Sequence, residues 1–215
     1  RAFAKASAAS RLRVQGKIFR KCLRLMSSHN LGRDLIRAYD RVRSAYTDSS
    51  QVVPSFLGSP SNLSQASLNR EMLLMLNLAP GLTVADLGSG CGITSNTFAL
   101  FGCEVTGFEF HGQSCDVART YAAKLGVADR VQFISGAVND NLGSSRFDRL
   151  HGGYMMNTRN AEAYALNNLN NNGVAVLNVG GRNNGDVWIY TKDAAGVVTK
   201  RATGIGVIFQ EDAKP

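Results

Sequence analysis

The fold of this chain is constrained above all by short apolar segments that recur from residue 82 onward and alternate with helix-like segments. Segments with helical periodicity lie at 93–101, at 113–125 and around 159–169. A loop is expected at 136–146, and the last two strands follow each other without a helix. The pattern predicts an α/β fold: a doubly wound, mostly parallel seven-stranded sheet that ends in an antiparallel hairpin. The seven strand-like segments are 82–87, 104–108, 131–135, 147–151, 174–179, 187–191 and 199–209.

Positive charge is concentrated at the start of the sequence. Residues 1–33 hold nine of the 24 Lys and Arg residues and no Asp or Glu, so the remainder is close to neutral. An extension rich in Arg, Ala and Ser is typical of a mitochondrial or plastid targeting peptide. Because the sequence starts at Arg1, we expect a cleaved form whose basic arm docks on RNA, anionic lipid or acidic protein, with a solvated tail as the alternative. The expected location is the mitochondrial matrix side, or else the cytoplasm.

Residues 34–80 are expected to form helices and a loop that cap a ligand site on a domain formed by residues 81–215. Helical spacing with a break near 27–32 predicts two short helices between residues 17 and 46. Residues 47–63 are rich in Ser, Pro, Gly and Asn and predict a long irregular loop, a feature that often carries a binding role. A helix over 68–78 should follow, with Ser67 as its N-cap.

The cysteines and the hydropathy exclude several classes of protein. Four cysteines show no paired or zinc-like spacing, so we expect reduced thiols and no metal site: Cys22, Cys91, Cys103 and Cys115. No apolar stretch reaches the roughly 18 residues that a membrane-spanning helix needs.

A glycine loop follows the first predicted strand and leads directly into a helix. Glycines at this place let a ligand approach the backbone, and the helix contributes free N–H groups and a positive dipole end. The GxGxG spacing fits a pyrophosphate poorly, and with Asp86 at its start it predicts a site for S-adenosylmethionine, which has no phosphate. An ordinary strand–helix turn is the alternative. The loop residues are Gly88, Ser89, Gly90, Cys91 and Gly92.

A second candidate contact lies at the end of the next strand, where Glu109 and Phe110 reach the carboxyl edge of the sheet. A carboxylate there can accept both hydroxyls of a ribose, and Phe110 can pack on the adenine. An exposed acid without a ligand is the alternative for Glu109.

Other polar and aromatic residues have structural interpretations. We expect His151 to be a satisfied core histidine, Cys91 to be a packing residue, and Trp188 and Tyr190 to pack the C-terminal hairpin. The asparagines at 167–172 should cap a helix and turn into the next strand. After the fourth strand there is no Asn-Pro-Pro-Tyr or Asp-Pro-Pro-Tyr sequence, which disfavours methylation of base or amide nitrogen.

Four stretches together resemble one family, protein-L-isoaspartate (D-aspartate) O-methyltransferase, over about residues 33–209. The resemblance implies a Rossmann-like class I methyltransferase fold, an S-adenosylmethionine cofactor, and methylation of the α-carboxylate of isoaspartyl residues in a protein or peptide substrate. It also implies that Ser64 orients the substrate carboxylate and closes over the cofactor, although a helix-capping role is the alternative. The stretches are Ala38-Tyr39-Asp40-Arg41, Asn62-Leu63-Ser64, Phe147 to Gly153, and Leu169 to Gly180.

The chain departs from the family pattern at three places around the same pocket. Gln65-Ala66-Ser67 follows Ser64 where the family has a proline, Gly136-Ala137 replaces glycine-aspartate, and Val207 to Gln210 replaces a substrate-binding segment. These losses favour an alternative: a catalytically degenerate domain, with cofactor binding either kept or lost, that serves as a structural subunit of a mitochondrial respiratory complex or ribosome. It would contact its partners through the basic arm. An RNA methyltransferase anchored by the arm is the least favoured hypothesis, because the body of the protein is near neutral.

Overall fold

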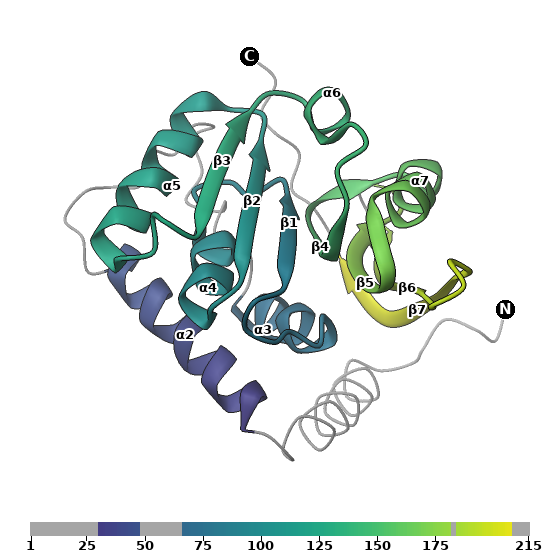
Figure 1. Ribbon diagram of the computed structural model, residues 1–215, viewed down its shortest axis with the longest axis horizontal. Coiled ribbons are helices and arrows are strands. Elements are labelled where there is room, and N and C mark those ends of the chain that lie inside the picture. Colours follow the sequence, from purple (N-terminus) through teal and green to yellow (C-terminus); the bar gives the residue numbers. More distant parts are fainter. Residues whose placement is uncertain (1–29, 48–65, 182–183, 208–215) are drawn as a thin grey trace, which may run out of the picture.

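The computed structural model describes residues 30–47, 66–181 and 184–207, and their central feature is one seven-stranded sheet (Figure 1). Its strand order is β3-β2-β1-β4-β5-β6-β7. The first five strands run parallel to one another, whereas β6 and β7 are each antiparallel to the strand before them. The predicted fold class is therefore confirmed. The strands are β1 (Thr83–Leu87), β2 (Glu104–Glu109), β3 (Val131–Ser135), β4 (Phe147–Met156), β5 (Leu169–Val179), β6 (Gly185–Lys192) and β7 (Val198–Val207).

Helices cover both faces of the sheet and divide the core into two layers (Figure 1). One layer packs against α2 (Leu31–Thr47), α3 (Ala66–Met75), α4 (Ile93–Phe101) and α5 (Gly112–Leu125). The other packs against α6 (Val138–Leu142) and α7 (Thr158–Asn168). The β1 strand is buried on both faces, as expected of a central parallel strand.

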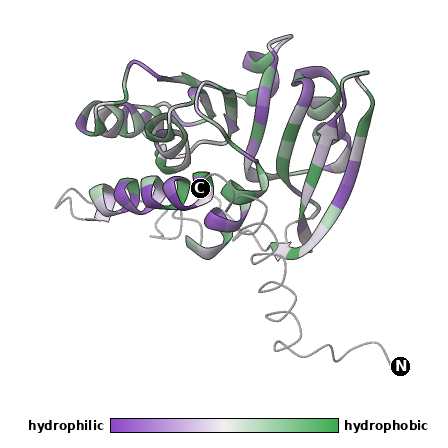
Figure 2. Ribbon diagram, turned by 60° about the horizontal axis from the view of Figure 1, so that its bottom comes forward, coloured by the Kyte–Doolittle hydropathy of each residue, from purple (hydrophilic) through white to green (hydrophobic). Residues whose placement is uncertain are grey.

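Local sequence explains where the helices begin and end. Both α4 and α5 end at a glycine in the left-handed region, Gly102 with φ 105° and Gly126 with φ 71°. The α7 helix starts at Asn157, whose side chain accepts a hydrogen bond from the amide of Asn160. Hydrophobic positions on α2 recur on one side, where Leu35, Tyr39 and Val42 are buried, and the opposite side is hydrophilic (Figure 2).

The structure corrects four details of the sequence interpretation. The expected loop at 136–146 contains α6, which has five residues and is too short to show a helical period. The β4 strand continues through Gly152-Gly153 to Met156 although apolar alternation is lost, because Gly152 pairs with β1 and Met155 and Met156 pair with β5 beyond a register shift. Ser67 lies inside α3, which begins one residue earlier, and is not its N-cap.

The fourth correction concerns the asparagine patch. Residues 170–172 belong to β5, and Asn172 has a positive φ of 61° where the β4–β5 register shifts, so they form a bulge instead of a turn before the strand. The side chain of Asn170 donates to Asp148, and that of Asn171 donates to the carbonyl of Ala194. The asparagines therefore fasten this bulge to neighbouring strands and loops.

Some expectations concern residues outside the described ranges. Residues 1–29 of the basic extension, and the loop at 47–63 from residue 48 onward, are among them. Within the described residues, no helix combines the length and apolar character needed to cross a bilayer.

Candidate functional site

The candidate site lies at the carboxyl edge of the sheet, where β1 has β2 on one side and β4 on the other. The connections from β1 lead first to β2 and β3, and the chain then crosses to β4, so this is the switch point of the topology. Ligands of open α/β sheets bind in the crevice at such a point. The glycine loop at 88–92 links β1 to α4 at this place.

The glycines of the loop are required by backbone conformation and by close packing. Gly88, Gly90 and Gly92 have φ values of 77°, 54° and 87°, which side-chain-bearing residues rarely adopt. A Cβ atom on Gly92 would lie 2.6 Å from the Cβ of Ala118, so this glycine also allows α4 and α5 to approach.

Four of the five backbone amides in the loop already donate to acceptors in the protein. The amides of Gly88 and Ser89 both donate to the carbonyl of Phe108, at 2.8 and 3.0 Å. The amide of Gly90 donates to Glu109 Oε2 at 2.8 Å. That of Gly92 donates to the carbonyl of Ser89 at 2.9 Å. The loop is therefore organised by its own protein partners and presents few amides to a ligand.

Glu109 connects the loop to the end of β2. Its side chain accepts from the amide of Gly90 through Oε2, and from the amide of His111 at 3.0 Å through Oε1. Glu109 is 9% exposed. An ionised carboxylate has about four acceptor positions, so lone pairs remain for the two hydroxyls of a ribose.

Asp86 is fully buried beneath the loop, in contact with α4 and β4. Its Oδ2 accepts from the hydroxyl of Ser95 at 2.6 Å, and its Oδ1 lies 2.8 Å from Nδ1 of His151. His151 is 3% exposed, and its Nε2 has no partner among the described residues. The expectation that His151 is a core histidine with both ring nitrogens hydrogen-bonded is thus correct for Nδ1 and wrong for Nε2.

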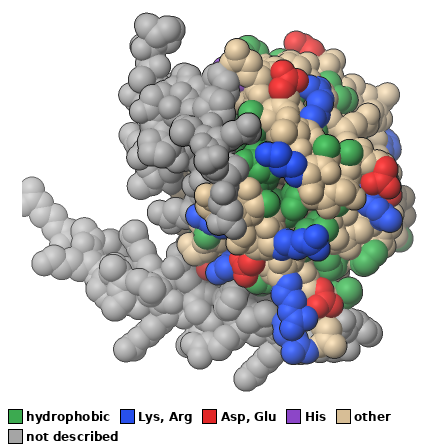
Figure 3. Space-filling model, turned by 90° about the vertical axis from the view of Figure 1, so that its left-hand side faces the viewer, with side chains coloured by type: hydrophobic (Ala, Val, Ile, Leu, Met, Phe, Trp, Pro, Cys, Tyr) green, Lys and Arg blue, Asp and Glu red, His purple; other side chains and the backbone are tan. Residues whose placement is uncertain are grey.

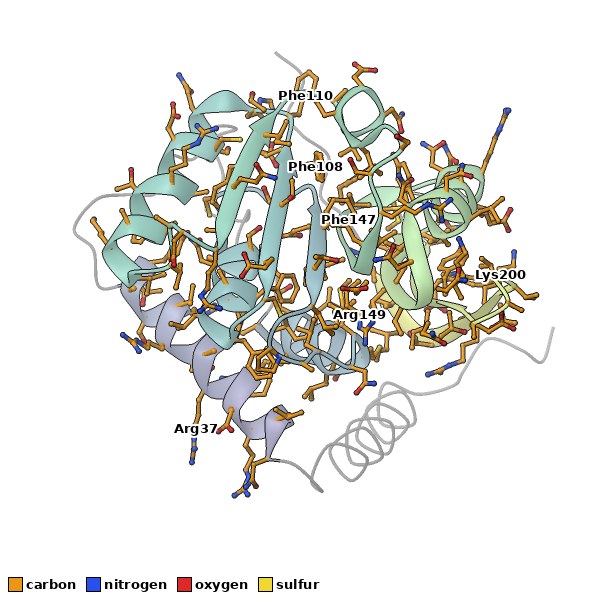
Figure 4. All side chains as sticks on the ribbon, in the orientation of Figure 1. Arg37, Phe108, Phe110, Phe147, Arg149 and Lys200 are labelled. Atoms are coloured by element: carbon orange, nitrogen blue, oxygen red, sulfur yellow. The ribbon has the colours of Figure 1, made fainter. Side chains whose placement is uncertain are left out.

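Phe110 is the exposed aromatic residue of the site. It lies beyond Phe108 at the carboxyl end of β2 (Figure 4) and is 67% exposed. Phe108 is buried edge-on against Phe147, with ring centroids 6.3 Å apart. Phe110 meets His111 edge-on and leaves apolar surface open, which suits packing against a planar ring.

A tyrosine that sequence reasoning missed holds the loop from the side of α2. Tyr46 donates its hydroxyl to the carbonyl of Cys91 at 2.6 Å, accepts from the side-chain amide of Asn96 at 2.9 Å, and stacks on Tyr121. Burial raises the pKa of the Cys91 thiol to about 11, so the thiol is protonated at neutral pH. No short-range motif connects Tyr46 to Cys91, since they are 45 positions apart.

A second missed tyrosine borders the start of the loop. Tyr154, in β4, lies so close to Gly88 that a Cβ atom on that glycine would be 2.8 Å from Cδ1 of the tyrosine ring. Its hydroxyl lies 3.2 Å from that of Tyr164 in α7, and Tyr164 donates to Oδ1 of Asn139 in α6. Burial raises the pKa of Tyr154 well above its ordinary value, so the phenol stays neutral.

The remaining predicted features give a mixed result. Ser64 lies outside the described residues. Ala137, which replaces the family's aspartate, precedes α6 without a side-chain cap, and the nearby Asn139 is engaged by Tyr164. Among the described residues there is no group of three His, Cys, Asp or Glu side chains that could hold a metal ion.

Comparison with known proteins supports the methyltransferase fold. Residues 82–157 match the family model described as RNA cap guanine-N2 methyltransferase. A protein-L-isoaspartate O-methyltransferase from Methylorubrum populi is 32% identical over 92 residues, which are 43% of this chain and 42% of that protein. The chain thus aligns with about two fifths of the length of this curated relative.

Solved structures extend the likeness to most of the fold. A putative protein-L-isoaspartate O-methyltransferase from Plasmodium falciparum, crystallised with S-adenosyl-L-homocysteine, superposes with a TM-score of 0.64 at 16% identity over 91% of this chain and 98% of that one. Another protein-L-isoaspartate O-methyltransferase gives a TM-score of 0.51 at 18% identity over 68% and 46%. The chain therefore has the Rossmann-like fold of class I S-adenosylmethionine-dependent methyltransferases, and part of its sequence is similar to protein-L-isoaspartate O-methyltransferase.

Proposed function

We propose that the chain binds S-adenosylmethionine at the glycine loop and methylates a carboxylate of a protein or peptide. The observation that carries the cofactor assignment is the pairing of Gly90 with Glu109. A pyrophosphate needs free loop amides and a positive helix end. Here a carboxylate already occupies the Gly90 amide and would repel a phosphate, whereas ribose hydroxyls can donate to it.

The cofactor fits the donors and acceptors that the site presents. S-adenosylmethionine has no phosphate, and when bound it would supply a methyl group on a positively charged sulfur. Glu109 would accept the ribose hydroxyls, Phe110 would pack on the adenine, and Asp86 would act on the ammonium group through backbone or water, because its two oxygens already contact Ser95 and His151. The S-adenosylhomocysteine bound to the Plasmodium structure supports the same assignment.

The carboxylate acceptor is proposed from the Methylorubrum relative, whose name specifies isoaspartyl O-methylation. A carboxylate is already a nucleophile at neutral pH, so no base is needed. The bound cofactor would supply the methyl group to an oxygen of this carboxylate and would be left as a neutral thioether. Catalysis then rests on positioning and on exclusion of water, and we propose Ser64 as the group that orients the acceptor.

The test combines binding with methyl transfer. Calorimetry should show S-adenosylmethionine binding, and labelled cofactor should give a base-labile methyl ester on an isoaspartyl peptide but not on the same peptide with ordinary aspartate. Capped RNA is included as an acceptor because of the family match at residues 82–157. Binding with label only on RNA would contradict the carboxylate acceptor, and absence of binding would contradict the whole proposal.

A second candidate function is a non-catalytic subunit of a mitochondrial assembly. It is favoured by Ala137, which offers no acid to the adenine edge, and by the engagement of Asn139 with Tyr164. The basic segment at residues 1–33 would provide the contact with partners. Co-migration with a large mitochondrial complex on a native gel, without methyl transfer, would support this function. A free monomer that turns over substrate would contradict it.

The charge on the side formed by α2, α5 and β3 gives little support to RNA as a partner of this face of the folded body. Basic side chains on the side formed by α2, α5 and β3 are interspersed with acidic ones (Figure 3). Exposed ion pairs join Arg37 to Asp34 and Arg119 to Asp116. A mixed surface of this kind does not form the continuous positive footprint that binds a phosphate backbone.

A further inference from the structure

Tyr154 stands where the glycine loop meets β4, and neither the sequence motifs nor the proposed chemistry gives it a role. The residue is half-buried, and its ring lies against Gly88. Next to it, a Cβ atom on Gly153 would lie 2.3 Å from the carbonyl oxygen of Gly88, so the backbone of β4 packs closely against the start of the loop. The half-buried ring therefore lies between the start of the glycine loop and the second core layer, against which it also packs.

The orientation of this ring is fixed by a chain of hydrogen bonds. Because Tyr164 donates its proton to Asn139, Tyr154 is the donor in the contact between the two phenols. These hydrogen bonds join three elements, β4, α7 and α6. The phenol is neutral and its proton is engaged, so a ligand that reached Tyr154 would meet an aromatic ring and not a charged oxygen.

The position of the ring indicates which part of a ligand it would meet. This step rests on the proposed function, in which Glu109 at the end of β2 accepts the ribose hydroxyls. The β4 strand lies on the other side of β1 from β2. An adenosyl ligand would thus extend from β2 across the glycine loop, and its 5′ substituent, which carries the sulfur, would approach β4 and Tyr154.

We infer that the ring of Tyr154 contacts the sulfonium group and makes the site prefer the charged methyl donor over the neutral product. A cation beside an aromatic ring is attracted to it, whereas the thioether of S-adenosylhomocysteine is not. Tyr154 is then a specificity-determining residue that also favours product release. A cation–π contact of ordinary strength gives a preference of roughly twofold to thirtyfold.

The experiment measures dissociation constants by calorimetry for the wild type and for Tyr154→Leu, Tyr154→Met, Tyr154→Phe and Tyr164→Phe. The ligands are S-adenosylmethionine, S-adenosylhomocysteine and sinefungin, in which an ammonium replaces the sulfonium. We expect Tyr154→Leu and Tyr154→Met to weaken binding of the two charged ligands while the neutral product binds as before. Tyr154→Phe should keep the preference for the charged ligands because the ring remains. Tyr164→Phe should change this preference less than Tyr154→Leu or Tyr154→Met does. Thermal melting identifies any variant that fails to fold. If either Tyr154→Leu or Tyr154→Met does not fold, the other still provides the test.

Three outcomes would overturn the inference. An equal loss for all three ligands would make Tyr154 a packing residue, and an equal gain would mean that its ring merely fills the site. If the ratio of the dissociation constants for the charged and neutral ligands stayed unchanged in both non-aromatic variants, the ring would not contribute to the preference for positive charge. In these cases the wild type still binds S-adenosylmethionine and the proposed function stands. A wild type that binds none of the ligands contradicts the proposed function and this inference together.

Discussion

The two halves of the sheet use buried polar groups in different ways. In the half formed by β1, β2 and β3, Asp86 and Glu109 contact the glycine loop or the helix that follows it. In the half formed by β4 to β7, buried polar side chains mainly support the framework. Arg149 donates to the carbonyls of Leu76 and Asn77 after α3, and Lys192 donates to those of Leu166 and Leu169 at the end of α7.

The buried polar groups of the two halves therefore have different roles, one in the proposed binding site and the other in the stability of the fold. In the first half the buried carboxylates contact the glycine loop and α4, which is the arrangement that the proposed cofactor site requires. The second half contains one of the three departures from the resembling family, at Val207, and here buried polar groups hold strands and helices together. Among the buried polar side chains, substitution of Glu109 in the first half should therefore alter ligand binding, whereas substitution of Arg149 in the second half should alter stability.

The largest effect is expected from Gly92→Val, which tests how far the loop also serves the fold. A Cβ atom there would meet Ala118 at 2.6 Å, and φ is 87°, so clash and backbone strain add. We expect a loss of about 4 kcal/mol or more in unfolding free energy, measured by urea denaturation. Gly126→Ala is the control, since φ is also positive there but no atom lies within 4 Å, and it should cost about 1 kcal/mol. Equal losses of unfolding free energy in Gly92→Val and Gly126→Ala would show that steric clash with Ala118 contributes nothing.

Arg149→Met should separate stability from binding in the second half. The substitution removes a buried guanidinium and leaves carbonyls of Leu76 and Asn77 without a donor, so we expect a loss of about 3 kcal/mol in unfolding free energy. Arg149 lies far from the labelled Phe110 at the carboxyl edge (Figure 4), and S-adenosylmethionine affinity should stay unchanged. The exposed Arg130→Met is the control and should cost less than about 0.5 kcal/mol. A drop in affinity for Arg149→Met in the folded protein would contradict the different roles of the two halves.

Glu109→Gln should have the opposite effect to Arg149→Met: it should weaken cofactor binding and leave stability nearly unchanged. It removes the charge that we propose accepts the ribose hydroxyls, and it removes the charge-assisted bond from Gly90, so we expect S-adenosylmethionine to bind about 30-fold to 100-fold more weakly. Calorimetry gives the affinity, and urea denaturation should show little change in stability. The exposed Glu104→Gln at the other end of β2 is the matched control. Unaltered affinity for Glu109→Gln would refute its assignment to the cofactor.

The smallest structural effect is expected from chemical labelling of Cys91. Its pKa of about 11 means that lowering the pH below this value removes the reactive thiolate. Alkylation at pH 8 should therefore be roughly a hundredfold slower than for an unburied cysteine with a pKa of 9.0, and the rate should rise steeply up to about pH 11. Peptide mass spectrometry measures the rate at this residue. Rapid labelling at pH 8 would show that the loop opens readily.

How much the sequence predicts differs between these halves as well. The first βα unit was predicted closely, because strand 82–87, the glycine loop and helix 93–101 each carry a local signal. The bulge at Asn172 and the continuation of β4 to Met156 depend on pairing with neighbouring strands, which local pattern does not reveal. The roles of Tyr46 and Tyr154 were missed for the same reason, since both residues meet the loop from distant positions.

The pairing of β1 with β4 also bears on when the site can form during folding. Asp86 and His151 are partners across these strands although they are 65 positions apart, whereas β6 and β7 form a local hairpin. Contacts of long sequence separation are slow to form because a long loop must close first. The hairpin can therefore assemble early, while the crevice appears only when β1 and β4 have met. Ligand binding would then report completion of folding and could serve as the signal in a refolding assay.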